Sequence, residues 1–419
     1  MNLSATGKPG QTVVIGGGIV GVCCAKWLQR DGQRVTIIDP NGPGEGCSSG
    51  NAGQFVTGYC VPLGLPGIVR QVPRMLLDPL GPLTIRWQYL PRLLPWLLRF
   101  TAASTARRVQ KIADAMHALN KDAMQDFAPL LKEAGAEHLV VNNGRLDVYE
   151  SEESFAKARV KFDLLRNCGV RTEVLDQQQI HELEPVLGDQ FHRGVFYPDS
   201  AHTTDPLRLT QVLAEDFLRR GGRILREKVT GFEFGPSGVV AVCTARETHP
   251  AHRVVLAAGA YSRPLAARLG SRLPLDAERG YHVMLPRAGI DLKRTIVNGD
   301  RYFGMTPMLG GLRLAGTVEL ASVGAAPNYA RADSLLRAAR HSFPLLGETG
   351  ATRWMGCRPS LPDSLPVLGR SPVHPDVYFA FGHGHLGLTG AATTGKIIAD
   401  LVADRAAPID ITPFRADRF

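Results

Sequence analysis

The chain has 419 residues, too many for one ordinary compact core, and its 44% hydrophobic and 21% charged residues are typical of a folded protein with two domains. The net charge of +9 comes from scattered basic residues without a nucleic-acid motif; we expect no nucleic-acid partner, and an anionic membrane or anionic substrates explain the charge equally well. The seven cysteines include no CxxC pair and indicate reduced, intracellular cysteine use rather than disulfides or a zinc site.

At the N-terminus, residues 1–12 lack the apolar core of a signal peptide, and no apolar run along the chain reaches the ~18 residues of a transmembrane helix. An apolar strand over 13–15, a helix and a second apolar strand over 35–38 follow, and Asp39 closes this unit. The turn before the helix carries G-x-G-x-x-G at Gly16, Gly18 and Gly21. A complete strand–helix–strand unit with these glycines and a terminal acid predicts dinucleotide binding, with the phosphates at the helix N-terminus.

The next stretch, "GCSSGNAGQ" over 46–54, is small, polar and rich in glycine. Ser48, Ser49 and Asn51 can bind a phosphate or a ring edge, and a plain surface loop is the alternative interpretation. Residues 105–134 then carry apolar residues at helical spacing, so we expect one long helix that ends at Gly135.

The later elements alternate between strands and helices. Asp205 and Pro206 predict an N-cap and first helical residue, and "LPLDAERGYHVMLP" and "GLRLAGTVEL" predict strands of a large antiparallel sheet. A buried strand over 254–258 precedes Gly259. Residues 377–402 predict a strand, a glycine-rich turn and a helix from about Thr389, whose positive end suits negative charge on a reduced flavin ring.

Several motifs together resemble one family. They are G-x-G-x-x-G, "SSGNAG", "VVLAAGAYS", "GCRPSLPDSLPVLG" and "GHGHLGLTGAATTGK", and they span nearly the whole chain. The combination is similar to the D-amino-acid oxidase superfamily of flavoproteins, and most of all to its D-amino-acid dehydrogenase branch, which includes bacterial D-hydroxyproline dehydrogenases. The resemblance implies FAD as the cofactor and oxidation of an amino-acid C–N bond.

The resemblance also implies an α/β fold with two interleaved domains. A Rossmann-like βαβ domain that binds FAD would comprise residues 1–60, 196–270 and 348–419. An α+β substrate domain, built on an antiparallel sheet, would comprise residues 61–195 and 271–347.

The FAD-binding residues that we expect come from the dinucleotide motif and from the family resemblance, with Val229 at the adenine end. They are Gly16, Gly18, Ile19, Val20, Gly21, Asp39, Pro40, Ser48, Ser49, Asn51, Ala52, Gly53, Gln54, Val229, Ala258, Gly259, Arg358, Gly384, His385, Leu386, Gly387, Leu388 and Thr389.

The substrate carboxylate is expected to pair with Arg358 of "GCRP", as in the family, because a guanidinium fork matches a planar carboxylate. A structural arginine is the alternative. Tyr281 and His282 are neighbours on a strand and point to opposite faces, so we expect only one of them to reach the site. Arg301 and Tyr302 fall where the family places a substrate contact.

His385 is expected beside the flavin pyrimidine ring, where it would bond the flavin or a substrate hydroxyl. The H-x-H spacing of His383 and His385 lacks a nearby carboxylate or cysteine, so we expect no metal. Some relatives attach FAD covalently through a cysteine in this region, and Cys357 falls one position away from that site. We expect no general base, because a neutral amine can assist hydride departure itself.

Residues 61–100 combine a high apolar content with aromatic residues, arginines and seven prolines, which exclude a single spanning helix. In the family the electron acceptor is usually the respiratory quinone pool. We therefore expect peripheral binding to the cytoplasmic side of the inner membrane, through Trp87, Tyr89, Trp96 and the two arginines Arg92 and Arg99. A protein–protein interface and a buried subdomain remain as alternatives, and without membrane contact the protein would be cytoplasmic.

The sequence therefore favours an FAD-dependent dehydrogenase that oxidises the Cα–N bond of a D-amino or D-imino acid, with D-proline or hydroxy-D-proline as expected substrates. Hydride would pass to flavin N5 and the electrons to a membrane quinone. An oxygen-using oxidase of glycine, sarcosine or D-amino acids and an electron-relay subunit of a heteromeric complex are the alternatives, with a nicotinamide dehydrogenase as a weaker one.

Overall fold

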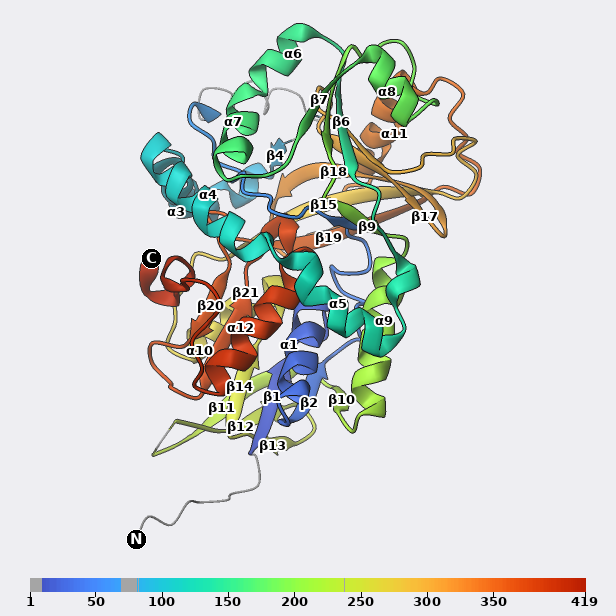
Figure 1. The fold of residues 1–419 in the computed structure, drawn as a ribbon. Helices are drawn as coiled ribbons and strands as arrows, with labels where there is room; N and C mark the ends of the chain where they lie inside the picture. The colour runs from blue at the N-terminus through green and yellow to red at the C-terminus, as the bar shows by residue number, and fades with distance from the viewer. Residues whose placement is uncertain (1–9, 69–80, 82, 237) are drawn as a thin grey trace.

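A computed structural model describes residues 10–68, 81, 83–236 and 238–419 of the chain. Two large sheets lie toward opposite ends of the molecule, and helices pack on one face of each (Figure 1). One sheet takes its strands from residues 11–39, 223–256 and 367–381 and the other from between residues 83 and 360, so neither sheet is formed by one continuous stretch.

The first sheet has six strands in the order β10-β2-β1-β14-β21-β20, all parallel except β20. The chain leaves β1 to one side for β2 and crosses later to the other side for β14 and β21. Such a reversal of strand order leaves a crevice at the carboxyl ends of the strands. The bounds are β1 Gln11–Ile15, β2 Arg34–Asp39, β10 Arg223–Arg226, β14 Arg253–Leu256, β20 Val367–Arg370 and β21 Val377–Phe381.

Helices α1 (Ile19–Arg30) and α12 (Ala391–Val402) pack together on one face of this sheet, beside α9 (Pro206–Arg219). They approach closely because Gly395 has no side chain: a Cβ there would lie 2.6 Å from the carbonyl oxygen of Cys23. Asp205 caps α9 by accepting a hydrogen bond from the Arg208 N–H, as the sequence predicts. A small sheet of β11 (Val229–Gly235), β12 (Gly238–Thr244) and β13 (Thr248–Pro250) packs on the opposite face.

The second sheet has nine strands, in the order β19-β15-β18-β17-β16-β6-β8-β7, with β4 beside β18. The two long strands β15 and β18 pair in antiparallel fashion, as the sequence predicts. Helix α11 (Ala330–Ser342) packs against these two strands. The bounds are β4 Leu83–Ile85, β6 Arg145–Tyr149, β7 Glu173–Asp176, β8 Arg193–Tyr197, β15 Asp276–Leu285, β16 Thr295–Asn298, β17 Phe303–Met308, β18 Gly311–Leu320 and β19 Thr352–Ser360.

The predicted domain boundaries remain a prediction. One strand contains a predicted boundary, and another pairs with the sheet of the other predicted domain. Strand β19 falls in the range 348–419 that we assigned to FAD binding, yet it pairs along its whole length with β15 of the nine-stranded sheet. Strand β8 contains the predicted boundary at 195/196 and pairs with β6 and β7. Sequence reasoning places such boundaries poorly because strand pairing is a long-range property.

The single long helix predicted over 105–134 is wrong. Two helices occupy this range, α4 (Ala106–Asn120) and α5 (Ala123–Ala134), and the second ends at Gly135 with φ 65°. The break has a tertiary cause: the Asn120 carbonyl accepts the Gly58 N–H, and the Asn120 side chain donates to the Tyr59 carbonyl at 3.0 Å. These bonds to another segment replace the helical continuation, which apolar spacing alone does not reveal.

The remaining elements connect the two sheets. Strands β3, β9 and β5 form a short sheet beside the nine-stranded one, in that order. The bounds are β3 Gln54–Phe55, β5 Val140–Val141, β9 Ala201–Thr203, α6 Glu152–Lys157, α7 Arg159–Asn167, α8 Gln177–Leu183 and α10 Ser262–Arg268. Six short 3-10 helices complete them: η1 Trp87–Tyr89, η2 Glu137–Leu139, η3 Gly259–Tyr261, η4 Gly384–Leu386, η5 Thr412–Phe414 and η6 Ala416–Arg418.

The apolar segment over 61–100 is partly described, since residues 69–80 and 82 lie outside the described residues. Its C-terminal part forms α3 (Leu90–Ala103), which continues through Pro95 and lies at the periphery of the molecule (Figure 1). One side of α3 packs on β4 and β18 through Leu93 and Trp96. No helix of the described residues has the length and apolar character that crossing a bilayer requires.

Candidate active site

A cavity of about 1010 Å³ lies between the two sheets. One wall comes from the carboxyl ends of β1, β2, β14 and β21, where the crevice of the parallel sheet is expected. The other wall is a face of the nine-stranded sheet, to which β15, β16, β17, β18, β19 and β6 contribute. The space is therefore large enough for a dinucleotide and a small second molecule together.

The glycines of the first turn have separate geometric roles. Gly16 adopts φ 115°, and a Cβ there would lie 2.4 Å from the Ala257 carbonyl oxygen. A Cβ at Gly21 would lie 2.0 Å from the Gly16 carbonyl oxygen, so this glycine allows helix and strand to touch. Gly18 precedes α1 and lines the cavity, and Ser48 accepts the Ile19 N–H at 3.0 Å. Backbone can therefore approach a bound phosphate closely.

Asp39 closes β2 at the edge of the cavity. Its two carboxylate oxygens accept the Gly17 N–H at 2.7 Å and the Asn41 N–H at 2.8 Å. Burial raises the pKa of Asp39, and these backbone hydrogen bonds oppose that rise. The carboxylate is thus fixed next to the glycine turn, where it can accept hydrogen bonds from ribose hydroxyls.

The loop over 46–54 is an ordered wall of the cavity. Asn51 holds its shape by donating to the Ser48 carbonyl at 2.8 Å and accepting the Gly53 N–H at 2.7 Å. The Arg313 guanidinium, which sequence reasoning missed, donates to the carbonyls of Ser49 and Asn51 at 3.2 and 2.7 Å. A plain surface loop would not be anchored to the opposite sheet in this way.

The C-terminal glycine turn forms the end of the cavity next to α12. Gly382 and Gly384 have φ of 93° and 55°, and the residues up to Leu388 line the cavity. The helix predicted from about Thr389 to Val402 is present as α12, which begins two residues later, at Ala391. Thr389 instead accepts the Val56 N–H at 3.1 Å and so holds this turn to the loop after β3.

Most of the predicted site residues line the cavity. Six do not: Gly21, Ser49, Gly53, Thr389, His282 and Arg301. Those that do are Gly16, Gly18, Ile19, Val20, Asp39, Pro40, Ser48, Asn51, Ala52, Gln54, Val229, Ala258, Gly259, Tyr281, Tyr302, Arg358, Gly384, His385, Leu386, Gly387 and Leu388.

Arg358 extends from β19 into the cavity. Its guanidinium lies over Gly280 of β15, where a Cβ would be 2.3 Å from Cζ, so a larger residue there would force the guanidinium to move. Nη1 donates to the Thr317 carbonyl at 3.1 Å, and within the described part of the chain the guanidinium forms no ion pair. The buried Glu278 stands opposite Arg358 in the strand register, and burial raises its pKa against the opposing effect of the Arg358 charge. Arg358 is therefore a cation open to an anionic ligand.

Arg145 of β6 is a second guanidinium in the cavity wall, and sequence reasoning missed it. Nε donates to Asp147 at 2.7 Å, and Nη1 lies 3.4 Å from the Gln54 amide oxygen. The ring of Tyr197 lies below it, with Cζ 5.4 Å from the ring centre. The sequence feature that could have indicated Arg145 is its position two residues before Asp147, on the same face of the apolar strand "RLDVY".

His385 lines the cavity at the glycine turn, where it is exposed to the cavity but surrounded by protein, and the charges of both arginines reach it. Burial lowers the pKa of His385 to about 4, and the charges of Arg358 and Arg145 act in the same direction. Tyr59, another cavity residue that the sequence did not indicate, contacts the His385 ring edge-on at 6.0 Å. The imidazole is therefore neutral near pH 7 and can donate or accept one hydrogen bond.

The two neighbours on β15 face opposite ways, as predicted. The Tyr281 hydroxyl donates to Glu319 at 2.5 Å, so it is already engaged although Tyr281 borders the cavity. His282 bonds the Gly50 carbonyl at 2.9 Å and stacks on Trp354, and both of these partners line the cavity. The Tyr281 hydroxyl and Nδ1 of His282 are thus both engaged by other residues of the described chain.

Of the neighbours Arg301 and Tyr302, only Tyr302 lines the cavity. Arg301 is bound to Glu150 at 3.2 Å outside the cavity, so the structure does not place it at the substrate. Tyr302 lines the cavity, has φ 56° and keeps 58% of its surface exposed. Its placement at the mouth makes it a candidate contact for whatever enters.

Two thiols also line the cavity. Burial raises the pKa of Cys47 to about 11, against the nearby positive charge of Arg358. Burial likewise raises the pKa of Cys357. Both thiols thus favour the protonated form, and Cys357 lies one position away from the cysteine through which some relatives attach their flavin.

A model of the family described as FAD dependent oxidoreductase (DAO) matches residues 11–401. The chain belongs to this FAD-dependent oxidoreductase family. Its cofactor is accordingly FAD, and the fold class that the sequence predicted is confirmed.

Relatives of the DAO-family chain match over almost their full length. It is 38% identical over 413 residues to a D-amino-acid oxidase of Bradyrhizobium diazoefficiens, which covers 97% of this chain and 98% of the relative. It is 32% identical over 436 residues to a D-amino acid dehydrogenase of a Methylobacterium species, with 98% and 99% covered. Glycine oxidase of Geobacillus kaustophilus has the same fold, with a TM-score of 0.74, 24% identity and 98% and 99% coverage.

The cavity fits FAD as the family requires. The glycine turn leaves room where a Cβ would collide, Asp39 is fixed beside it, and Val229 lines the cavity at the β11 side. Arg358, His385 and the glycine turn lie together toward α12. We expect the first group to hold the adenosine and diphosphate parts and the second to border the flavin ring.

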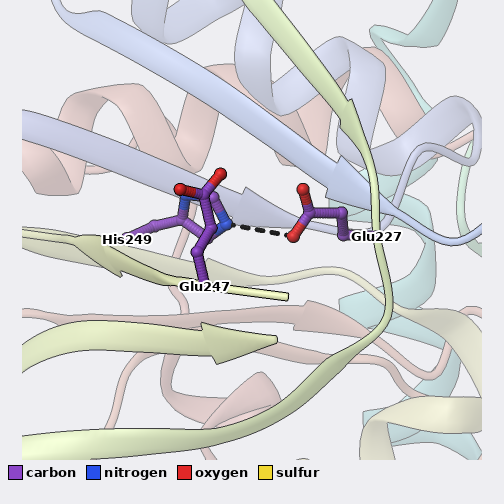
Figure 2. Close-up of side chains that lie close together, drawn as sticks. All are labelled: Glu227, Glu247 and His249. Atoms are coloured by element: carbon purple, nitrogen blue, oxygen red, sulfur yellow. Dashed lines mark hydrogen bonds and ion pairs between the residues drawn. The ribbon is translucent and has the colours of Figure 1, made fainter. Parts of the chain in front are cut away.

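The sequence predicts no metal, and this remains a prediction for the DAO-family protein. Away from the cavity, ligand atoms of Glu227, Glu247 and His249 lie within 4.8 Å of one another (Figure 2). Glu227 already accepts the Thr244 hydroxyl at 2.6 Å and contacts His249 at 3.3 Å. These internal hydrogen bonds account for the arrangement without an ion.

Proposed function

We propose that the protein oxidises the Cα–N bond of a D-amino or D-imino acid, with D-proline or hydroxy-D-proline as substrate, and passes the electrons to a membrane quinone. The observation that carries this proposal is Arg358, a guanidinium without an ion pair among the described residues, beside the expected flavin end of a dinucleotide-sized cavity. The D-amino-acid relatives support the substrate class.

The roles of the residues follow from their placement. Arg358 would bind the α-carboxylate through two parallel N–H···O bonds and so fix the position of the α-carbon. FAD, when bound, supplies the acceptor for the hydride. The neutral His385 would orient the amine or a substituent without withdrawing a proton at pH 7, since its pKa is lowered to about 4. This agrees with an amine that enters in its neutral form.

The membrane acceptor is supported by the outer face of η1 and α3. Trp87, Leu94 and Leu98 are 68%, 51% and 65% exposed. Residues 79–113 contain no acidic residue, and five cationic side chains of this range are exposed: Arg92, Arg99, Arg107, Arg108 and Lys111. An apolar and aromatic surface within a cationic field suits the headgroup region of an anionic membrane, such as the cytoplasmic side of the inner membrane.

The direct test is anaerobic addition of D- and L-amino acids, including the stereoisomers of proline and 4-hydroxyproline, to the purified flavoprotein. Loss of the visible flavin absorbance with D-imino acids, and not with their L-isomers, is the expected result. A yellow protein whose absorbance no amino acid changes would refute the proposal and favour an electron-relay subunit of a larger complex.

Use of oxygen is the second candidate, favoured by the relative named D-amino-acid oxidase at 38% identity. Turnover in air separates the two. A quinone-linked dehydrogenase should give little hydrogen peroxide and turn over rapidly with a soluble quinone. One peroxide per substrate oxidised in air, at an undiminished rate, would establish the oxidase instead.

A further inference from the structure

We propose that Arg145 binds a hydrogen-bond acceptor on the substrate side chain, a hydroxyl or a carboxylate, and so makes the enzyme prefer polar over apolar amino acids. The inference rests on the proposed function, because it takes Arg358 as the partner of the α-carboxylate.

The first argument is the placement of the two arginines. Arg358 comes from β19 and Arg145 from β6, with four strands between them in the sheet. Both nevertheless line one cavity, and the charges of both act on His385. The two side chains therefore converge on the same volume from different sides. A substrate whose α-carboxylate lies on Arg358 would direct its side chain across this volume.

The second argument is the free edge of the Arg145 guanidinium. Nε donates to Asp147, and among the described residues the single hydrogen bond of the Nη groups is the long one of 3.4 Å to the Gln54 amide oxygen. The side chain is only 10% exposed, yet it borders the cavity. Its remaining N–H groups thus have the cavity as the place where an acceptor can satisfy them.

The third argument is charge. Although burial acts to raise it, the pKa of Asp147 is lowered by Arg145 and Lys161, so the carboxylate is ionised. Asp147 lies 2.7 Å from Arg145 and 2.6 Å from Lys161. Two cations share one anion, and among these three groups one positive charge stays uncompensated. A hydroxyl or carboxylate oxygen of the substrate would be stabilised there, whereas an apolar group would displace water without gaining a partner.

The guanidinium is also held in place before a ligand arrives. Asp147 fixes one edge, and the Tyr197 ring supports one face at 5.4 Å from Cζ. The Tyr197 hydroxyl in turn donates to Asp147 at 3.3 Å. A donor fixed in this way discriminates between side chains better than a mobile surface arginine.

The test uses two matched pairs of substrates with the flavin-loaded enzyme. 4-Hydroxy-D-proline and D-proline differ by a hydroxyl, and D-glutamate and D-norvaline differ by a carboxylate in place of a methyl group. We expect the wild-type enzyme to have the higher kcat/KM for the polar member of at least one pair. In Arg145→Gln that value should fall about ten- to a hundredfold, while the apolar partner changes by less than about threefold. The pair that responds identifies hydroxyl or carboxylate.

The matched control is Arg294→Gln. Arg294 is also an arginine in an ion pair over an aromatic ring, with Glu184 at 2.9 Å and Phe196 at 5.5 Å, but it does not line the cavity. The Arg294→Gln variant should leave the ratio of kcat/KM between the polar and the apolar substrate unchanged in both pairs. If Arg145→Gln loses FAD, Arg145→Lys keeps the cation and should retain part of the preference. Equal losses for both members of each pair, or a wild-type enzyme without a preference, would overturn the inference while the proposed reaction stands. Failure of all four compounds to reduce the flavin would count against the reaction itself.

Discussion

At the scale of single residues, the site depends on side chains that are absent as much as on those present. The Arg358 guanidinium occupies its observed position because Gly280 has no Cβ, and Gly16 and Gly21 allow the first turn to meet Ala257 and to close on itself. These positions cannot accept even alanine without movement of a neighbour. Substitution of Gly280 should therefore affect binding of the substrate, and substitution of Gly16 or Gly21 should affect binding of the cofactor.

Gly280→Ala should displace the Arg358 guanidinium and leave the FAD site intact. A Cβ at 2.3 Å from Cζ forces the side chain away, so kcat/KM should fall by at least about tenfold, chiefly through KM. Steady-state kinetics and flavin content measure the two effects. Gly324→Ala is the control, because its Cβ would meet nothing within 4 Å. Unchanged kinetics in Gly280→Ala would show that Arg358 does not hold the substrate.

Arg301→Gln tests the correction made by the structure. Because Arg301 is bound to Glu150 outside the cavity, the variant should retain kcat/KM within about twofold and lose at most about 1 kcal/mol of unfolding free energy. A loss of more than tenfold in kcat/KM would return Arg301 to the substrate site.

At the scale of elements, helix α3 has one side buried against the protein and an opposite side exposed to solvent. Trp96 is buried at 6% exposure and stacks on Phe100 at 5.2 Å, so this tryptophan belongs to the core and not to a membrane contact. The Tyr89 hydroxyl donates to Asp276 at 2.8 Å, which fixes the start of the helix on β15. The residues available to a membrane are therefore those of the opposite side of the helix.

Serine at Trp87, Leu94 and Leu98 together should weaken co-sedimentation with vesicles of phosphatidylcholine and phosphatidylglycerol at low salt by at least about tenfold, since three exposed apolar groups are removed. FAD content and soluble activity should stay unchanged. The control carries serine at Leu309 and Leu345, which are 73% and 95% exposed elsewhere. A wild-type protein that stays in the supernatant would contradict membrane binding altogether.

The elements also show what the sequence could predict. Gly16, Gly18, Asp39 and Arg358 belong to short motifs whose chemistry is local, and the structure places them along one cavity. Arg145 and Tyr59 could not be found in this way. Arg145 reaches the cavity because β6 pairs with β16, far away in sequence, and Tyr59 is held by the break between α4 and α5. Contacts of that kind exist only after the sheet has assembled.

At the scale of the whole molecule, buried histidines link stability to pH. Burial lowers the pKa of His202, His282 and His383 to about 4 from the ordinary 6.5. Between these values the unfolded chain binds protons that the folded chain excludes. The stabilisation is complete above about pH 6.5 and declines as the pH falls toward 4.

The free energy of unfolding, measured with urea, should therefore be lower at pH 5 than at pH 7.5. In His383→Gln this difference should shrink by about 2 kcal/mol or less, the share of one histidine. The exposed His192→Gln serves as the control. An unchanged pH difference in His383→Gln would show that His383 takes up its proton equally in both states.

The close contact of α1 with α12 has a consequence for the order of assembly. The cofactor-binding wall of the cavity begins with the first described strand, β1. The glycine turn that completes the cavity, and helix α12, which packs on Cys23 and Trp27, come from residues 382–402. A chain emerging from the ribosome thus carries the phosphate turn long before the opposite wall exists. FAD would be captured only after residues 382–402 have been made, and chains that end before α12 should remain colourless.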